Sequence, residues 1–101
     1  MTEIRPDAIG TSQVDNDRVR VTEWRLPPRA HTGWHRHEYD YVVVPLAGGP
    51  LKIESAGGLG DAEMVTGRSY FRQAGVEHDV INDSPGEIVF IEVEFKTPVP
   101  A

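Results

Sequence analysis

Three histidines are the residues in this chain whose type and spacing best suit metal chemistry. His35 and His37 are separated by one residue in a strand-like segment, and His78 lies in a later strand-like segment. Because side chains two positions apart on a strand point to the same face, His35 and His37 can bind one ion together. A third imidazole from a neighbouring strand would leave coordination positions open, as in a metal site that performs chemistry.

The elements that position these histidines are expected to be short β-strands. Eight prolines and ten glycines separate short β-branched and aromatic runs along the 101 residues, and helical periodicity is nearly absent. This pattern is typical of an all-β sandwich or barrel. A loop is expected over 56–61. The expected strands are 18–26, 35–46, 51–55, 62–65, 69–72, 76–81 and 87–95.

The segment 87–95 has the clearest alternation of apolar and polar residues. Its apolar face is formed by Val89, Ile91, Val93 and Phe95. Glu92 and Glu94 alternate with these residues, so we expect them in water or at a contact between sheets. Ile88 and Phe90 would then lie on the outer face, where a second copy of the chain would cover them. This arrangement predicts a homodimer.

Length, charge and cysteine content narrow the classes of function. A chain of 101 residues, 39% of them hydrophobic, supports one small domain. We expect an arm or short strand over 1–16, a barrel over 17–96 and a frayed tail over 97–101. The formal net charge of −6 argues against a nucleic-acid partner. The sequence has no cysteine, no secretory signal pattern and no apolar run long enough for a membrane span, so we expect a cytoplasmic protein.

Two stretches resemble the two motifs of the cupin superfamily. The first motif, with its His-x-His pair between two glycines, is similar to RAHTGWHRHEYDYVVVPLAG; the second, with its later His and Asn, is similar to GRSYFRQAGVEHDVIN. The resemblance covers roughly residues 17–95. It implies a small single-domain cupin with an all-β double-stranded barrel, or jelly roll. The matching positions are His35, His37, Gly48, Gly67, Gly75, His78 and Asn82.

The sequence departs from the cupin motifs at three positions. Arg29 replaces the opening glycine of the first motif and Gln73 replaces the proline of the second, and both substitutions affect only turns. Tyr41 occupies the position of the glutamate ligand. Neither Glu38 nor Asp40 is expected to substitute for it, because both lie on the strand face opposite the histidines unless a bulge shifts the phase. The resemblance therefore implies a site with three histidine ligands.

An ion held by three neutral imidazoles keeps its full double charge and favours an anionic ligand. Imidazole suits Fe(II), Ni(II) and Zn(II), and the likeness to iron-dependent cupin dioxygenases makes Fe(II) the first choice. The resemblance thus implies a non-haem oxygenase acting on a small organic acid or diketone-like substrate. One alternative is a metal-assisted isomerase or lyase acting on a sugar-like or keto acid substrate. Another is a small-ligand-binding cupin without turnover.

Several other residues are candidates for the site. Tyr41 shares the face of the histidines and is the catalytic candidate, orienting substrate or donating a hydrogen bond to a developing anion; the alternative is an aromatic that fills the barrel. Tyr70 and Arg72 are the substrate-binding candidates, with Arg72 for a carboxylate; the alternative is that Tyr70 packs and Arg72 faces solvent. His31 lies off the motif and is expected in an exposed loop, and Asn82 is expected to hold a turn.

Overall fold

The computed structural model describes residues 4–96, and every regular element in that range is a β-strand. The all-β prediction is therefore confirmed. No helix in this part of the chain is long and apolar enough to cross a membrane. The expected frayed tail over 97–101 lies outside the described residues. The strands are β1 (Ile9–Asp15), β2 (Val19–Leu26), β3 (His35–Arg36), β4 (Asp40–Ala47), β5 (Gly49–Ser55), β6 (Gly58–Met64), β7 (Tyr70–Arg72), β8 (Glu77–Asn82) and β9 (Ile88–Phe95).

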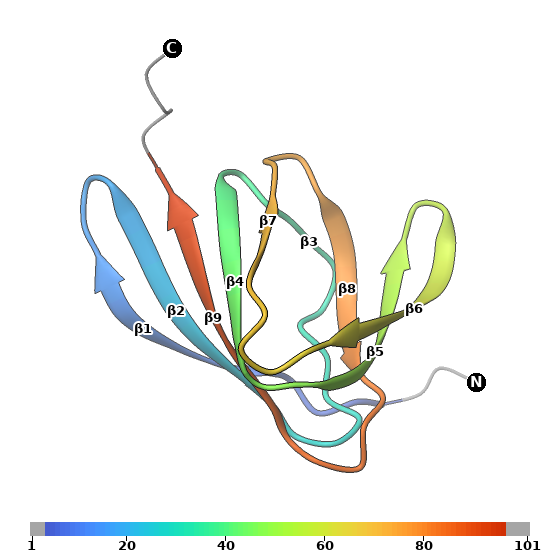
Figure 1. Cartoon of the computed structure of the whole chain (residues 1–101). Helices are drawn as coiled ribbons and strands as arrows, with labels where there is room; N and C mark the ends of the chain where they lie inside the picture. The colour runs from blue at the N-terminus through green and yellow to red at the C-terminus, as the bar shows by residue number, and fades with distance from the viewer. Residues whose placement is uncertain (1–3, 97–101) are drawn as a thin grey trace.

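The strands form two antiparallel sheets that face each other (Figure 1). The first sheet has the order β1-β2-β9-β4-β7, and the second has the order β3-β8-β5-β6. β9 lies at the centre of the first sheet, where it pairs with β2 along its whole length and with β4 from Val89 to Phe95. After β3 the chain passes between the two sheets at each connection except the β5–β6 hairpin, and it closes a jelly-roll barrel around one interior.

The core fills one end of this barrel, and a buried asparagine fixes the loops there. The buried cluster includes Leu26, Val80 and Ile88. Asn82 is 1% exposed, and its amide nitrogen donates to the carbonyls of Leu26 and Gly86, both at 2.8 Å. Its side-chain oxygen accepts from the Ser84 amide at 2.8 Å, which closes the turn before β9. The expectation that Asn82 holds a turn is confirmed.

The predicted strand over 35–46 is interrupted, because the chain changes sheets within it. β3 pairs with β8 in the four-stranded sheet, whereas β4 pairs with β7 and β9 in the five-stranded sheet. His37 lies between the two strands. Its amide donates to the Val76 carbonyl at 2.9 Å, and its carbonyl accepts from the Gly75 amide at 2.8 Å. The break preserves the predicted orientation of Tyr41, which is 2% exposed and faces the barrel interior.

The loop predicted over 56–61 is wrong, because β6 already begins at Gly58. Ser55 pairs with Gly58, so the hairpin loop contains only Ala56 and Gly57. Gly58 has a φ of 110°, a conformation that a residue with a side chain rarely adopts. Glycine has a low strand propensity, and three glycines between 57 and 60 concealed the start of this strand.

The two faces of β9 are the reverse of the prediction. Ile88 and Phe90 belong to the buried core, so they are not available for a dimer contact. Glu94 is 6% exposed, and Glu92 also lines the barrel interior. The apolar residues that alternate with them face outward. The prediction failed because it took the apolar face as the inner one, whereas this barrel encloses polar groups.

Gly48 lies between β4 and β5, where the backbone passes close to the end of β6. A Cβ atom on Gly48 would lie 2.0 Å from the backbone oxygen of Met64, a contact that no rotamer change relieves. We expect Gly48→Ala to lower the free energy of unfolding by more than about 2 kcal/mol in urea denaturation. Gly57→Ala is the control, because its nearest neighbour would lie 4.0 Å away. Equal stabilities of the two variants would contradict this packing.

Candidate metal centre

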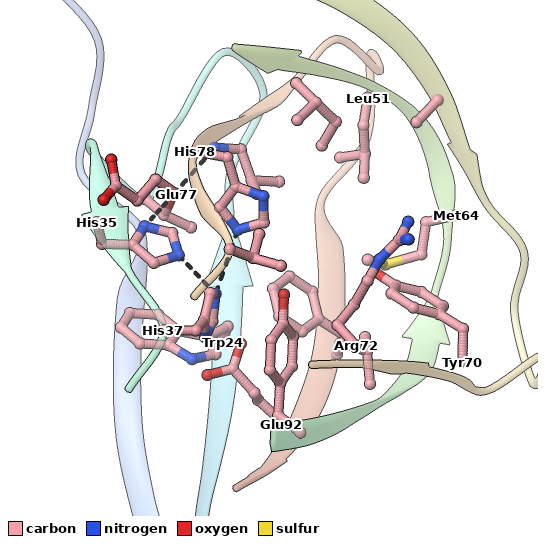
Figure 2. A pocket seen from close by; sticks show the side chains of 18 of the residues that line it. Trp24, His35, His37, Leu51, Met64, Tyr70, Arg72, Glu77, His78 and Glu92 are labelled. Atoms are coloured by element: carbon pink, nitrogen blue, oxygen red, sulfur yellow. Dashed lines mark hydrogen bonds between the residues drawn. The ribbon is translucent and has the colours of Figure 1, made fainter. Parts of the chain in front are cut away.

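Three imidazole rings converge at one place on the barrel wall. His35 on β3 lies directly opposite His78 on β8 in the strand register, and His37 follows β3. The Nε2 atom of His37 lies 2.9 Å from Nε2 of His35 and 3.2 Å from Nε2 of His78 (Figure 2). The ring atoms available as ligands all lie within 4.8 Å of one another. The structure thus brings together the three histidines that the sequence singled out.

A local network sets the orientation of the His35 ring. Its Nδ1 lies 2.8 Å from the carbonyl oxygen of Gly33, and only a protonated Nδ1 makes this a hydrogen bond. Gly33 is held in turn, since its amide donates to a side-chain oxygen of Asp79 at 3.0 Å. With the proton on Nδ1, the lone pair of His35 lies on Nε2 and faces the other two rings. A backbone carbonyl behind a histidine is the usual way to orient a metal ligand.

Burial keeps the other two rings neutral. It lowers the pKa of His37 to about 4, with a smaller contribution from the nearby His35. Burial likewise lowers the pKa of His78 to about 4, and the positive charges of neighbouring groups add to the effect. At neutral pH these rings therefore present lone pairs rather than protons, which is the form that binds a metal ion.

The donor set fits a divalent transition metal. Imidazole nitrogens about 2.1 Å from one ion, at adjacent coordination positions, lie about 3 Å apart. The contacts of 2.9 and 3.2 Å between Nε2 atoms match that spacing. Neutral nitrogens so close together repel one another unless a shared cation draws them in. Nitrogen donors favour iron, nickel, zinc or copper over magnesium or calcium.

No carboxylate joins the converging group. Asp40, one of the two candidates weighed from the sequence, instead accepts a hydrogen bond from the Ala74 amide at 2.8 Å. Glu38, the other, is exposed and lies outside the group. Tyr41 fills the expected carboxylate position, and its ring stacks on His37 with centroids 3.9 Å apart. Burial raises the pKa of Tyr41 above its ordinary value, so its phenol stays protonated at neutral pH.

The histidines open into a cavity of about 750 Å³ between the two sheets. The opposite wall belongs to the five-stranded sheet, where Arg72 pairs with Tyr41 and Tyr70 pairs with Val43. Arg72 and Tyr70 therefore line the cavity, and the guanidinium carbon of Arg72 lies 5.4 Å from the centre of the Tyr70 ring (Figure 2). Within residues 4–96, Arg72 has no hydrogen-bond or ion-pair partner. The roles assigned to Tyr41, Tyr70 and Arg72 stay predictions.

Sequence reasoning expected two carboxyl groups of this cavity in water or at a contact between sheets. Glu94 accepts two hydrogen bonds from Arg20, at 3.0 and 2.7 Å. Glu92, two positions earlier, has no such partner, and burial raises its pKa to about 7. Their strict alternation with Phe90 was a usable signal, since all three residues face one side of β9. It was overlooked because charged residues on a strand are most often solvated.

His31 is not part of the metal group. Its Nδ1 lies 2.9 Å from a carboxylate oxygen of Asp79, and its backbone bridges Asp7 and Ile81. It is therefore a structural residue at the strand crossing rather than the exposed loop residue that was expected.

Comparisons with known proteins agree with this geometry. A family model described as a cupin domain matches residues 22–94. The beta-alanine degradation protein BauB of Pseudomonas aeruginosa is 58% identical over 92 residues, which are 91% of this chain and 97% of that protein. A cupin domain from Bordetella pertussis Tohama I superposes with a TM-score of 0.91 and 54% identity, over 95% of this chain and 100% of that one.

A more distant likeness shows the fold alone. The polyketide cyclase RemF from Streptomyces resistomycificus superposes with a TM-score of 0.71 at 21% identity. The match covers 95% of this chain and 72% of that one.

The convergence of the rings predicts one ion per chain. In calorimetric titration with Zn(II), we expect the affinity of His78→Ala to fall by more than about a hundredfold. Loss of a ligand costs more affinity than loss of a residue that only orients a ligand. Asp61→Asn is the control and should bind like the wild type, since Asp61 pairs with Lys52 on the exposed hairpin and lies outside the group. Wild-type affinity in His78→Ala would contradict a shared site.

Proposed function

The chain belongs to the cupin domain family, and on that premise we propose that it is a metal-dependent enzyme acting on a small organic acid. The observation that carries the proposal is the pairing of two features across one cavity. Three imidazoles converge on one wall, and an arginine that has no acidic partner within residues 4–96 lies on the other. Such a cavity offers two positive anchors to an anionic substrate, the ion and the guanidinium.

The substrate class we propose is a 3-oxo acid. The relative BauB is named for beta-alanine degradation. Beta-alanine carries its amine two carbons from the carboxylate, and removal of that amine by oxidation or transfer leaves a 3-oxo acid. Its carbonyl and carboxylate stand in the same 1,3 relation as the oxygens of a diketone, so its enolate is a bidentate anion. This is the type of ligand that an ion with full double charge favours.

The residues of the chain would divide the work as follows. His35, His37 and His78 would hold the ion, which supplies activation of dioxygen if it is iron and Lewis acidity if it is zinc or nickel. Arg72 donates a charge-assisted hydrogen bond to the substrate carboxylate oxygen that does not face the ion. The protonated phenol of Tyr41 donates a hydrogen bond to the oxygen on which negative charge develops.

Iron-dependent oxygenation is the first version of this proposal, and a metal-assisted isomerase or lyase is the second. The second is favoured by one observation, the unpaired carboxyl group of Glu92 in the cavity, because such reactions need a group that moves protons. Both versions use the same ion site. They differ in whether zinc can replace iron, since zinc has no redox chemistry.

Oxygen uptake with two matched substrates tests the proposal. We expect the protein loaded anaerobically with Fe(II) to consume oxygen with 3-oxobutanoate and with pentane-2,4-dione. Arg72→Gln should raise the KM for 3-oxobutanoate about tenfold or more, because a charge-assisted hydrogen bond is lost. Its KM for the neutral diketone should stay near the wild-type value. Arg68→Gln, on the exposed turn before β7, is the control.

Other outcomes separate the alternatives. Substrate conversion that persists with Zn(II) and without oxygen would identify an isomerase or lyase and remove the oxygenase version. Saturable binding of 3-oxobutanoate with no conversion under any metal would identify a binding protein. An equal rise in KM for both substrates would contradict carboxylate binding by Arg72.

We also propose that a second copy of the chain covers the outer face of the five-stranded sheet. Valines and an isoleucine form a continuous apolar stripe across its three central strands, where Val93 pairs with Val21 on β2 and with Val42 on β4. Ile91 pairs with Val44 beside them. Each is only partly buried within one chain. A contiguous apolar surface of this kind is typical of an interface between subunits.

Sedimentation equilibrium tests this interface. We expect the wild type to have the mass of a dimer and Val93→Glu to have the mass of a monomer, because the new charge would be buried without a partner. Ala56→Glu, in the exposed hairpin loop between β5 and β6 of the other sheet, is the control and should stay dimeric. A wild type that is monomeric at all concentrations would contradict the proposal.

A further inference from the structure

Glu92 occupies a position in the cavity wall that neither the fold nor the metal group accounts for. It lies on β9 at the centre of the five-stranded sheet, opposite Thr22 on β2 and Val43 on β4. Its side chain points into the barrel together with those of Phe90 and Glu94. A charged residue in the central strand of a barrel costs free energy unless it is paired, so its presence calls for an explanation.

The two carboxyl groups on this face differ in their partners. Glu94 is held by Arg20 through two hydrogen bonds. Within residues 4–96, Glu92 makes no hydrogen bond or ion pair. Every fully buried side-chain oxygen or nitrogen in this part of the chain has a hydrogen-bond partner. Because the Glu92 oxygens have none, they are not fully buried. The oxygens of Glu92 are therefore reachable from the cavity, where a small molecule would meet them.

The surroundings of Glu92 suit proton transfer at neutral pH. Burial and the negative charge of Glu94 raise its pKa to about 7, and Arg20 opposes this effect. A base is most effective when its pKa lies near the working pH. Two adjacent carboxyls with different partners commonly divide into a permanently charged group and one that exchanges protons. The titratable and charged groups that act on Glu92 or feel its charge are Glu94 on β9, Arg20 on β2, Tyr41 on β4 and Tyr70 on β7.

We propose that Glu92 is a catalytic base that removes a proton from the carbon between the two oxygen-bearing carbons of a 3-oxo acid. The C–H bond breaks and its electron pair forms the double bond of the enolate. Negative charge moves to the carbonyl oxygen, and the proton forms a bond to a Glu92 oxygen. Return of that proton to the enolate oxygen gives the enol tautomer, whereas return to carbon restores the keto acid; either step regenerates the Glu92 carboxylate. The inference rests on the proposed function, because it takes a 3-oxo acid as substrate.

The cavity supports this role through the arrangement of its walls. The histidines belong to β3, to β8 and to the connection after β3, whereas Glu92 and Arg72 belong to the five-stranded sheet (Figure 2). Tyr41 lies on β4 of the same sheet. A molecule in the cavity meets the metal group on one side and Arg72 and Glu92 on the other, with the Tyr41 ring stacked beside His37. Arg72 would fix the carboxylate, Tyr41 would receive the developing oxyanion, and Glu92 would take the proton.

Solvent deuterium exchange tests the inference without any redox step. The Zn(II)-loaded protein and 3-oxobutanoate are mixed in D₂O under nitrogen, and loss of the proton signal at the central carbon is followed by NMR. We expect the wild type to exceed the buffer rate, and Glu92→Gln to lose about a hundredfold or more of that enhancement. The wild-type rate should rise with pH and then level off, because the carboxylate is the active form; the pKa of Glu92 is about 7 without the ion, and the charge of Zn(II) lowers it.

Two measurements guard against trivial explanations. Glu87→Gln, whose carboxylate pairs with Arg25 on the surface, should exchange like the wild type. Glu92→Gln should bind one Zn(II) with wild-type affinity and retain its fold. In the metal-free protein labelled with [13Cδ]glutamate, one carboxyl signal should titrate near pH 7 and be missing from Glu92→Gln.

The outcomes distinguish this inference from the proposed function. Exchange in Glu92→Gln at the wild-type rate would overturn the inference, as would a wild type that does not exceed the buffer or a Glu92 midpoint near 4.5. Exchange that depends on Glu92 in a protein that never consumes oxygen would support the inference and reject only the oxygenase version.

Discussion

The architecture of this site depends on three imidazole nitrogens held almost in contact. Their Nε2 separations of 2.9 and 3.2 Å bring nitrogen lone pairs together, which repel one another. Protonation of a ring would relieve this repulsion, but burial opposes protonation of His37 and His78. A shared metal cation resolves this conflict. The backbone makes the arrangement possible by pairing His35 with His78 across β3 and β8 and by fixing His37 at the point where the chain changes sheets.

The cavity divides its chemistry between two walls. The four-stranded sheet and the adjoining turn carry the nitrogen donors, whereas the five-stranded sheet carries a guanidinium, a phenol and an unpaired carboxyl. Burial acts on both walls, since it favours the uncharged forms of His37, His78, Tyr41 and Glu92. An anion that enters this interior interacts more strongly with its few positive charges than it would in water.

Much of this site could be predicted from the sequence because it depends on local spacing. The strand period places His35 and His37 on one face, and the motif around His78 supplies the third ring. The inner face of β9 could not be read in the same way. Alternation shows that Glu92 and Glu94 share a face with Phe90, but only the path of neighbouring strands decides which face is inside. The ion pair of Glu94 with Arg20 joins residues 74 positions apart, a contact that no local pattern encodes.

A crystal of the metal-loaded protein, measured at the absorption edge of its ion, tests the central claim most directly. An anomalous difference map should contain one strong peak per chain, bonded to Nε2 of His35, His37 and His78, with light-atom ligands completing the coordination. A peak at any other place, or a fourth protein ligand that closes the coordination sphere, would contradict an open three-histidine centre.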